Sequence, residues 1–162
     1  MKRIKLTQGK YAMVDDCDFE ELSKHKWYAE KSGNTFYAAR GVTVDVNQQK
    51  IIKMHRVILG LSSPDVLCDH IDGNGLNNTR ANIRSCTRNQ NQMNKRLSAK
   101  NTTGFKGVCL NKKTGKFYAQ IKVGRKNKYL GYFDCPLKAA KAYNCAAKKL
   151  HGEFASPNII KE

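Results

Sequence analysis

A polar segment between residues 68 and 91 carries the side chains best suited to chemistry. Asp69 and His70 are adjacent, and they could supply a carboxylate ligand for a hard cation and a neutral imidazole that accepts a proton near pH 7. Such a pair would suit phosphodiester hydrolysis, which needs an activated water, a cation on the phosphoryl and leaving oxygens, and a scaffold that aligns both. Because neighbouring residues of a strand point to opposite faces, we expect the pair to lie at a bend or a strand end.

The spacing of two later asparagines is specific. Asn82 lies 12 residues after His70, and Asn91 lies 9 residues after Asn82. With these residues, the segment from about 55 to 94 resembles the HNH endonuclease family in its ββα-metal fold. The resemblance implies that Asp69 and Asn91 bind one Mg²⁺-type ion, with Mn²⁺ as a substitute. It also implies that His70 is the general base and that Asn82 fixes the β-hairpin through backbone hydrogen bonds. Many members have His where Asn91 stands, and an amide oxygen suits Mg²⁺ better than imidazole does.

Several other residues of the first part of the chain have competing interpretations. Asp72 opens an Asp-Gly turn, so we expect it to be structural. His55 opens a short predicted helix, as a packing or capping residue or as a neighbour of the active site. His25 and His151 are expected to be ordinary surface residues. Three arginines are candidate phosphate clamps, with solvated charge as the alternative for each: Arg80, Arg84 and Arg88.

The positive charge of the chain is unevenly distributed. The 162 residues include 30 Lys and Arg against 13 Asp and Glu, a formal net charge of +17. Residues 1–94 hold 14 basic and 10 acidic residues, a net of +4, and residues 95–162 hold 16 basic and 3 acidic, a net of +13. Such an excess opposes folding through self-repulsion, and its usual reason is a polyanionic partner. We therefore expect the C-terminal part to be the main electrostatic binder of that partner.

Residues 1–94 are expected to form a small N-terminal α+β region that includes the nuclease centre. Asp18 is the predicted N-cap of a short helix, with Glu21 completing a capping box. The other expected elements are a strand at 11–14, a hairpin of 27–29 with 35–38, a strand at 50–54 and a short helix at 55–60.

Residues 104–162 are expected to form a second domain after a basic linker at 95–103, to which Lys95, Arg96 and Lys100 contribute. Residues 116–123 alternate: Phe117 and every second residue after it are apolar, which is typical of a half-buried antiparallel strand. Further strands are predicted at 105–110 and 128–133. A helix is predicted at 136–150, with Pro136 in its first turn and Gly152 just beyond its end. The pattern predicts a three-stranded antiparallel sheet packed on one helix.

Residues 102–158 resemble the AP2 DNA-binding domain. The similarity is carried by Phe105-Lys106-Gly107-Val108, Gly115 to Ile121, Tyr129-Leu130-Gly131-Tyr132-Phe133, Ala139 to Ala147, Gly152 and Asn158. It implies that the sheet enters the major groove while the helix packs behind it. The predicted DNA contacts are Lys106, Lys116, Tyr118, Gln120, Lys122 and Tyr129, and Gln can read adenine through two hydrogen bonds. Cys109 and Asn111 stand where arginines are common, so the recognition sequence stays open. A solvated sheet face with scattered lysines is the alternative.

The six cysteines show no C-x-x-C pair, so we expect free thiols and no four-cysteine zinc site. Met1 to Lys5 is followed by no apolar stretch, so neither a secretory leader nor a membrane span is expected. We therefore expect an intracellular protein, in the cytoplasm of a bacterial host, that acts as a monomer. The family resemblance implies that a phage or mobile element encodes it.

Two functions of different class fit these features. The first is a site-selective, homing-type endonuclease whose second domain supplies affinity and register on double-stranded DNA. The alternative is a DNA-binding regulator whose HNH centre is inactive, and intact Asp69, His70 and Asn91 argue against it. RNA binding is a third interpretation, but no RNP-like aromatic cluster in the sequence supports it.

Overall fold

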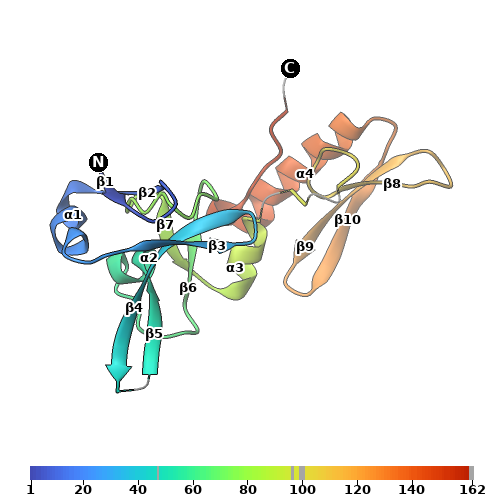
Figure 1. Cartoon of the computed structure of the whole chain (residues 1–162). Helices are drawn as coiled ribbons and strands as arrows, with labels where there is room; N and C mark the ends of the chain where they lie inside the picture. Colours follow the sequence, from blue (N-terminus) through green and yellow to red (C-terminus); the bar gives the residue numbers. More distant parts are fainter. Residues whose placement is uncertain (47, 96, 99–100, 161–162) are drawn as a thin grey trace. The chain divides into compact units, whose positions relative to one another are not determined.

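The computed structural model describes residues 1–46, 48–95, 97–98 and 101–160. The chain divides into two units, Met1–Arg88 and Asn89–Glu162 (Figure 1). Helices and small antiparallel sheets occur in the described residues, so the predicted α+β class is confirmed. Arg96 and Lys100 of the predicted basic linker lie outside the described residues.

In the described residues before α3, the first unit contains three small antiparallel sheets and two short helices. One sheet pairs β1 (Lys2–Lys5) with β2 (Tyr11–Val14). The second has the order β3 (Tyr28–Ser32), β4 (Thr35–Asp45) and β5 (Gln48–Lys53). The third is the hairpin of β6 (Leu67–His70) with β7 (Ile83–Cys86). The predicted strands at 11–14 and 50–54 and the predicted hairpin are confirmed to within a few residues.

One apolar core joins these sheets to the helices. Its most buried members are Ala12, Val14 and Met54. Trp27 packs in the same cluster, and its indole Nε1 donates a hydrogen bond to the Leu22 carbonyl at 2.8 Å. Met54 begins α2 (Met54–Ile58) directly after β5. Because Met54 is fixed in the core, the next residue along the helix is held at the hairpin of β6 and β7.

Helix α1 (Asp16–Ser23) starts earlier than predicted, with Asp15 as its N-cap. The prediction that Asp18 caps the helix is wrong. Its carboxylate accepts two hydrogen bonds from the Arg80 guanidinium, at 2.8 and 2.7 Å. Asp15 also accepts a hydrogen bond from the Arg80 backbone nitrogen at 2.7 Å. The start of α1 therefore holds the loop that precedes β7, a long-range role that local sequence cannot reveal.

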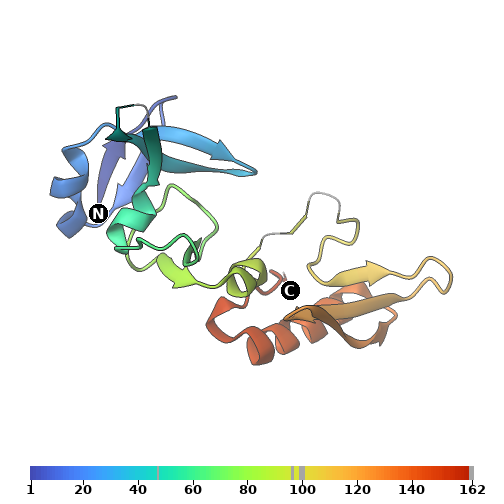
Figure 2. The ribbon, with the colours of Figure 1, turned by 90° about the horizontal axis from the view of Figure 1, so that it is seen from below.

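Helix α3 (Arg88–Met93) begins at the last residue of the first unit, and its other residues belong to the second. The second unit also contains a three-stranded antiparallel sheet with the order β10-β9-β8. Its strands are β8 (Val108–Leu110), β9 (Phe117–Val123) and β10 (Lys126–Phe133). Helix α4 (Pro136–His151) runs along one face of this sheet, as Figure 2 shows. A short 3₁₀ turn (Gly152–Phe154) follows. The predicted helix at 136–150 and the strand at 116–123 are confirmed.

The alternation of β9 explains how α4 packs. Ala119 and Ile121 are buried against alanines of α4 and Tyr143, whereas Tyr118 and Gln120, which alternate with them, stay partly exposed. Apolar positions at helical spacing on α4 thus meet apolar positions at strand spacing on β9. This agrees with the predicted division of the strand into an apolar face and a polar face.

Strand β8 is shorter than the predicted strand at 105–110, whose first half is wrong. Gly104 and Gly107 have φ angles of 75° and 74°, a left-handed conformation that ends an extended strand. A Cβ on Gly107 would come within 2.2 Å of the Tyr143 ring. The chain therefore turns here and passes close to α4.

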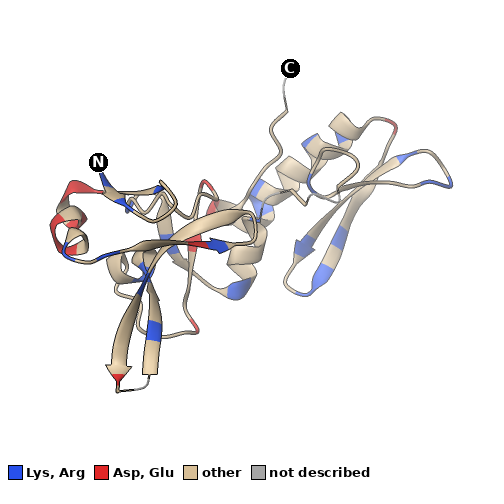
Figure 3. Ribbon diagram, in the orientation of Figure 1, with Lys and Arg blue, Asp and Glu red and all other residues tan. Residues whose placement is uncertain are grey.

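Figure 3 shows Lys and Arg recurring along β9, β10 and α4, and Asp and Glu gathered on α1. All six cysteines are free thiols. Within the described part of the chain, no helix has both the length and the apolar character needed to cross a membrane.

Candidate active site

The hairpin of β6 and β7 places Asp69 and His70. In its register Asp69 lies opposite Arg84 and His70 lies opposite Ile83. His70 is the last residue of β6, and Ile71 immediately bonds through its backbone nitrogen to the Asn82 carbonyl at 2.8 Å. The expectation that the Asp-His pair lies at a strand end is confirmed. Both side chains are buried, each 5% exposed.

Aromatic rings surround His70. The His55 ring lies edge-on to it, with ring centroids 5.1 Å apart, and the Tyr37 ring lies 5.7 Å from it. The side chain of His55 is buried. Of the two interpretations of His55, the structure therefore favours a neighbour of the candidate site, brought there by α2.

A buried asparagine fixes the orientation of the His70 imidazole. Asn78 is 0% exposed, and its Oδ1 lies 3.2 Å from His70 Nε2. The amide nitrogen of Asn78, Nδ2, donates to the Leu76 carbonyl at 3.4 Å. The oxygen Oδ1 is therefore the end of the amide that faces the imidazole. The network assigns the ring proton to Nε2, so the lone pair of neutral His70 lies on Nδ1. No role was predicted for Asn78 from the sequence, although it belongs to the polar segment between residues 68 and 91.

Burial keeps both histidines neutral near pH 7. It lowers the pKa of His70 below its ordinary value, against opposing effects of the Asn78 hydrogen bond and of nearby carboxylates. It also lowers the pKa of His55 to about 3, helped by the neighbouring His70. A general base must be neutral to accept a proton, and His70 meets this condition.

Asp69 forms a buried ion pair. Its Oδ2 accepts hydrogen bonds from Arg84 Nε at 3.1 Å and from Arg84 Nη2 at 2.8 Å. The Arg84 side chain is only 15% exposed, so it compensates the carboxylate charge inside the protein. Arg84 is therefore engaged beside the predicted metal ligand, and its role as a phosphate clamp stays a prediction.

The other two candidate clamps differ in their surroundings. Arg80 is held by Asp18 at 2.7 Å, whereas Arg88 is exposed at the start of α3. A phosphate would have to share Arg80 with Asp18. Their contacts with DNA stay predictions.

Asn82 holds the loop between β6 and β7 together. Its Oδ1 accepts from the Asp72 backbone nitrogen at 3.0 Å, and its Nδ2 donates to Asp72 Oδ1 at 3.0 Å and to the Asn77 carbonyl at 2.8 Å. Asp72 also accepts from the Asn74 backbone nitrogen at 2.7 Å, the bond of an Asx turn. Asp72 is thus structural, as predicted, and the loop after His70 is tied at both ends.

Two kinds of metal donor lie on this hairpin. Asp69 offers hard carboxylate oxygens, the ligands that Mg²⁺ prefers. On the other face of β6, the ligand atoms of His55, Cys68 and His70 lie within 4.8 Å of one another. Asn91 is partly buried on α3, in the second unit, and its part in a metal site stays a prediction. Cys68 was not predicted to be a metal donor, although its spacing of two residues from His70 places both side chains on one face of a strand.

The second unit carries an aromatic group on the face of its sheet that α4 does not cover. The rings of Tyr118, Tyr129 and Tyr132 lie with centroids 5.5 to 6.4 Å apart. A register shift between Tyr129 and Gly131 lets two tyrosines three residues apart share one face. Tyr132 was not among the predicted contacts, because this bulge is invisible in the alternation. The group is flanked by exposed or partly exposed polar residues from the predicted set: Lys116, Gln120 and Lys122.

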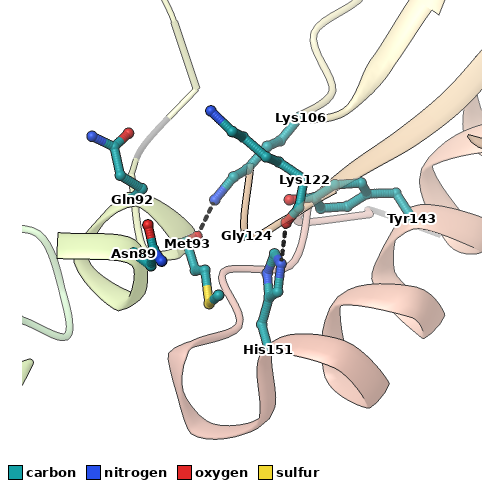
Figure 4. A pocket seen from close by; sticks show the side chains of 8 residues that line it. All are labelled: Asn89, Gln92, Met93, Lys106, Lys122, Gly124, Tyr143 and His151. Carbon is teal, nitrogen blue, oxygen red and sulfur yellow. Dashed lines mark hydrogen bonds between the residues drawn. The ribbon is translucent and has the colours of Figure 1, made fainter. Parts of the chain in front are cut away.

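Lys106 differs from the other predicted contacts. Its Nζ donates to the Met93 carbonyl at 2.6 Å, and burial lowers its pKa to about 8. It borders a pocket of about 130 Å³, shown in Figure 4. There His151 Nε2 lies 2.9 Å from the Lys122 carbonyl. His151 is buried, so the prediction of a surface residue is wrong. The pocket is lined by Asn89, Gln92, Met93, Lys106, Lys122, Gly124, Tyr143 and His151.

The comparisons with known proteins give one informative match. No family model matches the chain, and no solved structure matches it. The chain is 33% identical over 158 residues to a protein of Acanthamoeba polyphaga mimivirus that is named an uncharacterized HNH endonuclease. The match covers 94% of this chain and 77% of the relative, so it includes residues of both units.

Proposed function

Because this chain belongs to the HNH endonuclease family, we propose that it is a metal-dependent endonuclease that hydrolyses phosphodiester bonds in double-stranded DNA. One observation carries the proposal: a buried histidine stands at a strand end, with its Nε2 3.2 Å from Asn78 Oδ1. The lone pair on His70 Nδ1 is then the group that takes the proton of the attacking water. A positioned base of this kind typically contributes about 10²–10⁴ in rate.

Asp69 and Asn91 would hold the metal ion, Mg²⁺ or in its place Mn²⁺. The donors suit such an ion, because both offer oxygen and Mg²⁺ takes only one or two protein ligands. Asp69 is buried beside a cation in this structure, Arg84, as a buried carboxylate requires. When bound, the ion supplies positive charge to the phosphoryl and leaving oxygens.

Other residues of the hairpin orient the reacting groups. Asn82 ties the loop that follows His70, so the imidazole keeps its place when DNA arrives. Arg84 beside Asp69, together with Arg80 and Arg88, would contact phosphates and fix the register of the backbone.

Residues 104–162 would supply affinity and site selectivity, as the AP2 resemblance implies. Five of the proposed contacts are on the sheet face opposite α4: Lys116, Tyr118, Gln120, Lys122 and Tyr129. The sixth is Lys106, whose Nζ would have to leave the Met93 carbonyl to reach DNA. Support comes from the net charge of +13 on residues 95–162 and from the exposed side chains of Tyr129 and Tyr132. We further propose that the protein acts as a monomer inside a host cell on behalf of a virus or mobile element, in the manner of homing endonucleases.

Cleavage of supercoiled plasmid tests the nuclease. The wild type should nick or linearise the plasmid with Mg²⁺ and should not do so with EDTA. His70→Ala should lose about 10²–10⁴ in rate while still shifting duplex DNA in a gel. His25→Ala is the matched control, because His25 is an exposed histidine of the same unit. A folded His70→Ala variant that cuts within a few-fold of wild type would exclude His70 as the base.

A further inference from the structure

Three donors for a softer metal ion meet on one side of β6. Cys68 and His70 are two residues apart on this strand, so they share a face, and Asp69 between them points to the other. His55 reaches the same face from α2, and its ring lies against His70. The ligand atoms of the three side chains all lie within 4.8 Å of one another.

His55 has an unused nitrogen. Its Nδ1 is buried and has no hydrogen-bond partner in the part of the chain that the structure describes, and the residue as a whole is 6% exposed. A buried polar atom left without a partner costs about 1–3 kcal/mol, so such atoms usually serve a ligand, an ion or a water. A bound cation would satisfy this nitrogen.

The donor set selects against Mg²⁺. A thiolate and two imidazoles are ligands of Zn²⁺ and similar ions, whereas Mg²⁺ takes oxygen. Three protein ligands leave the fourth tetrahedral position to water. Zinc-ligand bond lengths place tetrahedral N and S ligands about 3.3–3.6 Å apart, so the side chains would have to close by about 1 Å from their widest separation.

We propose that His55, Cys68 and His70 form a binding site for a Zn²⁺-type ion, and that occupation of this site switches the nuclease off. His70 has one lone pair while Nε2 carries its proton, so an imidazole that binds the ion cannot also take a proton from water. The inhibitory half of this inference rests on the proposed function, whereas the metal site itself does not.

Binding is tested with Co²⁺, which replaces Zn²⁺ and absorbs visibly. Metal-free, reduced full-length protein should show a thiolate-to-cobalt charge-transfer band and the strong visible bands of tetrahedral Co²⁺ at one equivalent. Cys68→Ser should remove the charge-transfer band. Cys86→Ser is the matched control: Cys86 is also buried on this hairpin, but it pairs with Leu67 and so faces away from Cys68. It should leave the spectrum unchanged.

Inhibition is tested by adding Zn²⁺ to cleavage reactions at fixed Mg²⁺. Wild type and Cys86→Ser should lose activity at similar Zn²⁺ concentrations. Cys68→Ser should need at least about 10-fold more Zn²⁺, the least that loss of even an outer partner of a metal site costs. His55→Gln removes a second ligand from another element and should act in the same direction, which covers the case in which Cys68→Ser does not fold.

The outcomes separate the two proposals. Absence of the charge-transfer band in the wild type, or its persistence in Cys68→Ser, would overturn the metal site. Equal sensitivity of all variants to Zn²⁺ would overturn the inhibitory role, because the ion would then act elsewhere, for example at Asp69. A wild type that shows the cobalt spectrum but never cuts DNA with Mg²⁺ would sustain the metal site and refute the proposed function.

Discussion

Replacing Asn78 by leucine should slow cleavage by up to about tenfold without weakening DNA binding. The change removes the oxygen that lies 3.2 Å from His70 Nε2, and with it the preference for the tautomer that keeps the lone pair on Nδ1. A hydrogen bond of this kind contributes a net of about 0.5–1.5 kcal/mol, and about 1.4 kcal/mol corresponds to a factor of ten in rate. Some stability should also be lost, because Asn78 is fully buried and its amide bonds the Leu76 carbonyl.

Asn78→Asp separates the tautomer effect from a loss of structure. The carboxylate can still accept the Nε2 proton, so the plateau rate should largely recover. The negative charge also favours the imidazolium, and an opposite charge at this distance raises a histidine pKa by about 1–3. The rate follows the neutral fraction of His70, whose pKa burial lowers in the wild type. The acidic limb of the pH-rate profile should therefore move to higher pH.

Single-turnover cleavage of a labelled duplex across pH, with thermal unfolding of each variant, measures both effects. A merely structural role of Asn78 would lower the rate at every pH and leave the midpoint in place. If both variants retain the wild-type rate and midpoint, Asn78 does not set the tautomer of His70, and the assignment of Nδ1 as the proton acceptor fails.

Three further perturbations test the metal ligand, the buried histidine pair and the sheet face. Asp69→Asn should abolish Mg²⁺-dependent cleavage and keep DNA binding in a gel-shift assay. Asp69→Ala should in addition lower the melting temperature, because loss of one partner from a buried pair can cost about 3–5 kcal/mol and here leaves Arg84 uncompensated. The pKa of His55 is about 3 when folded and about 6.5 when unfolded. The contribution of neutral His55 to the free energy of unfolding should thus be fully present above about pH 6.5. It should fall by about 1.4 kcal/mol per pH unit as the pH decreases toward 3. Denaturant titrations should show a shallower fall in His55→Gln. Lys122→Ala should weaken binding to all duplexes alike and reduce the salt dependence by about one phosphate contact. Gln120→Ala should change the sequence preference. If Gln120→Ala weakens binding to all sequences equally, Gln120 does not read a base.

Elements with a strong local period could be predicted from the sequence. In β9 the apolar residues alternate, and in α4 they recur at helical spacing, and both patterns arise because each element buries one side. The position of Asp69 and His70 at a strand end could be predicted from their proposed chemistry. Adjacent side chains on a straight strand diverge and could not act on one phosphate.

Features that depend on distant partners could not be predicted. Asp18 has the sequence of a helix cap, yet its carboxylate binds Arg80, which is 62 residues away. The contact between His55 and His70 arises when α2 folds onto the hairpin of β6 and β7. The residues around His55 in the sequence therefore do not predict it. The shared face of Tyr129 and Tyr132 depends on a bulge, and alternation alone predicts opposite faces for them.

The alternation of β6 explains how adjacent residues can meet opposite electrostatic requirements. A general base must be neutral, and burial among rings favours the neutral form of His70. A carboxylate ligand must be charged, and a buried charge needs a partner. Asp69 points to the other face of the strand, where Arg84 supplies that partner at 2.8 Å. Because His70 is the last residue of β6, the chain can still bring both side chains to one phosphate, as the proposed reaction needs. One residue of register thus separates the two environments, which is why a shift of this strand should abolish activity even if every side chain of the site were retained.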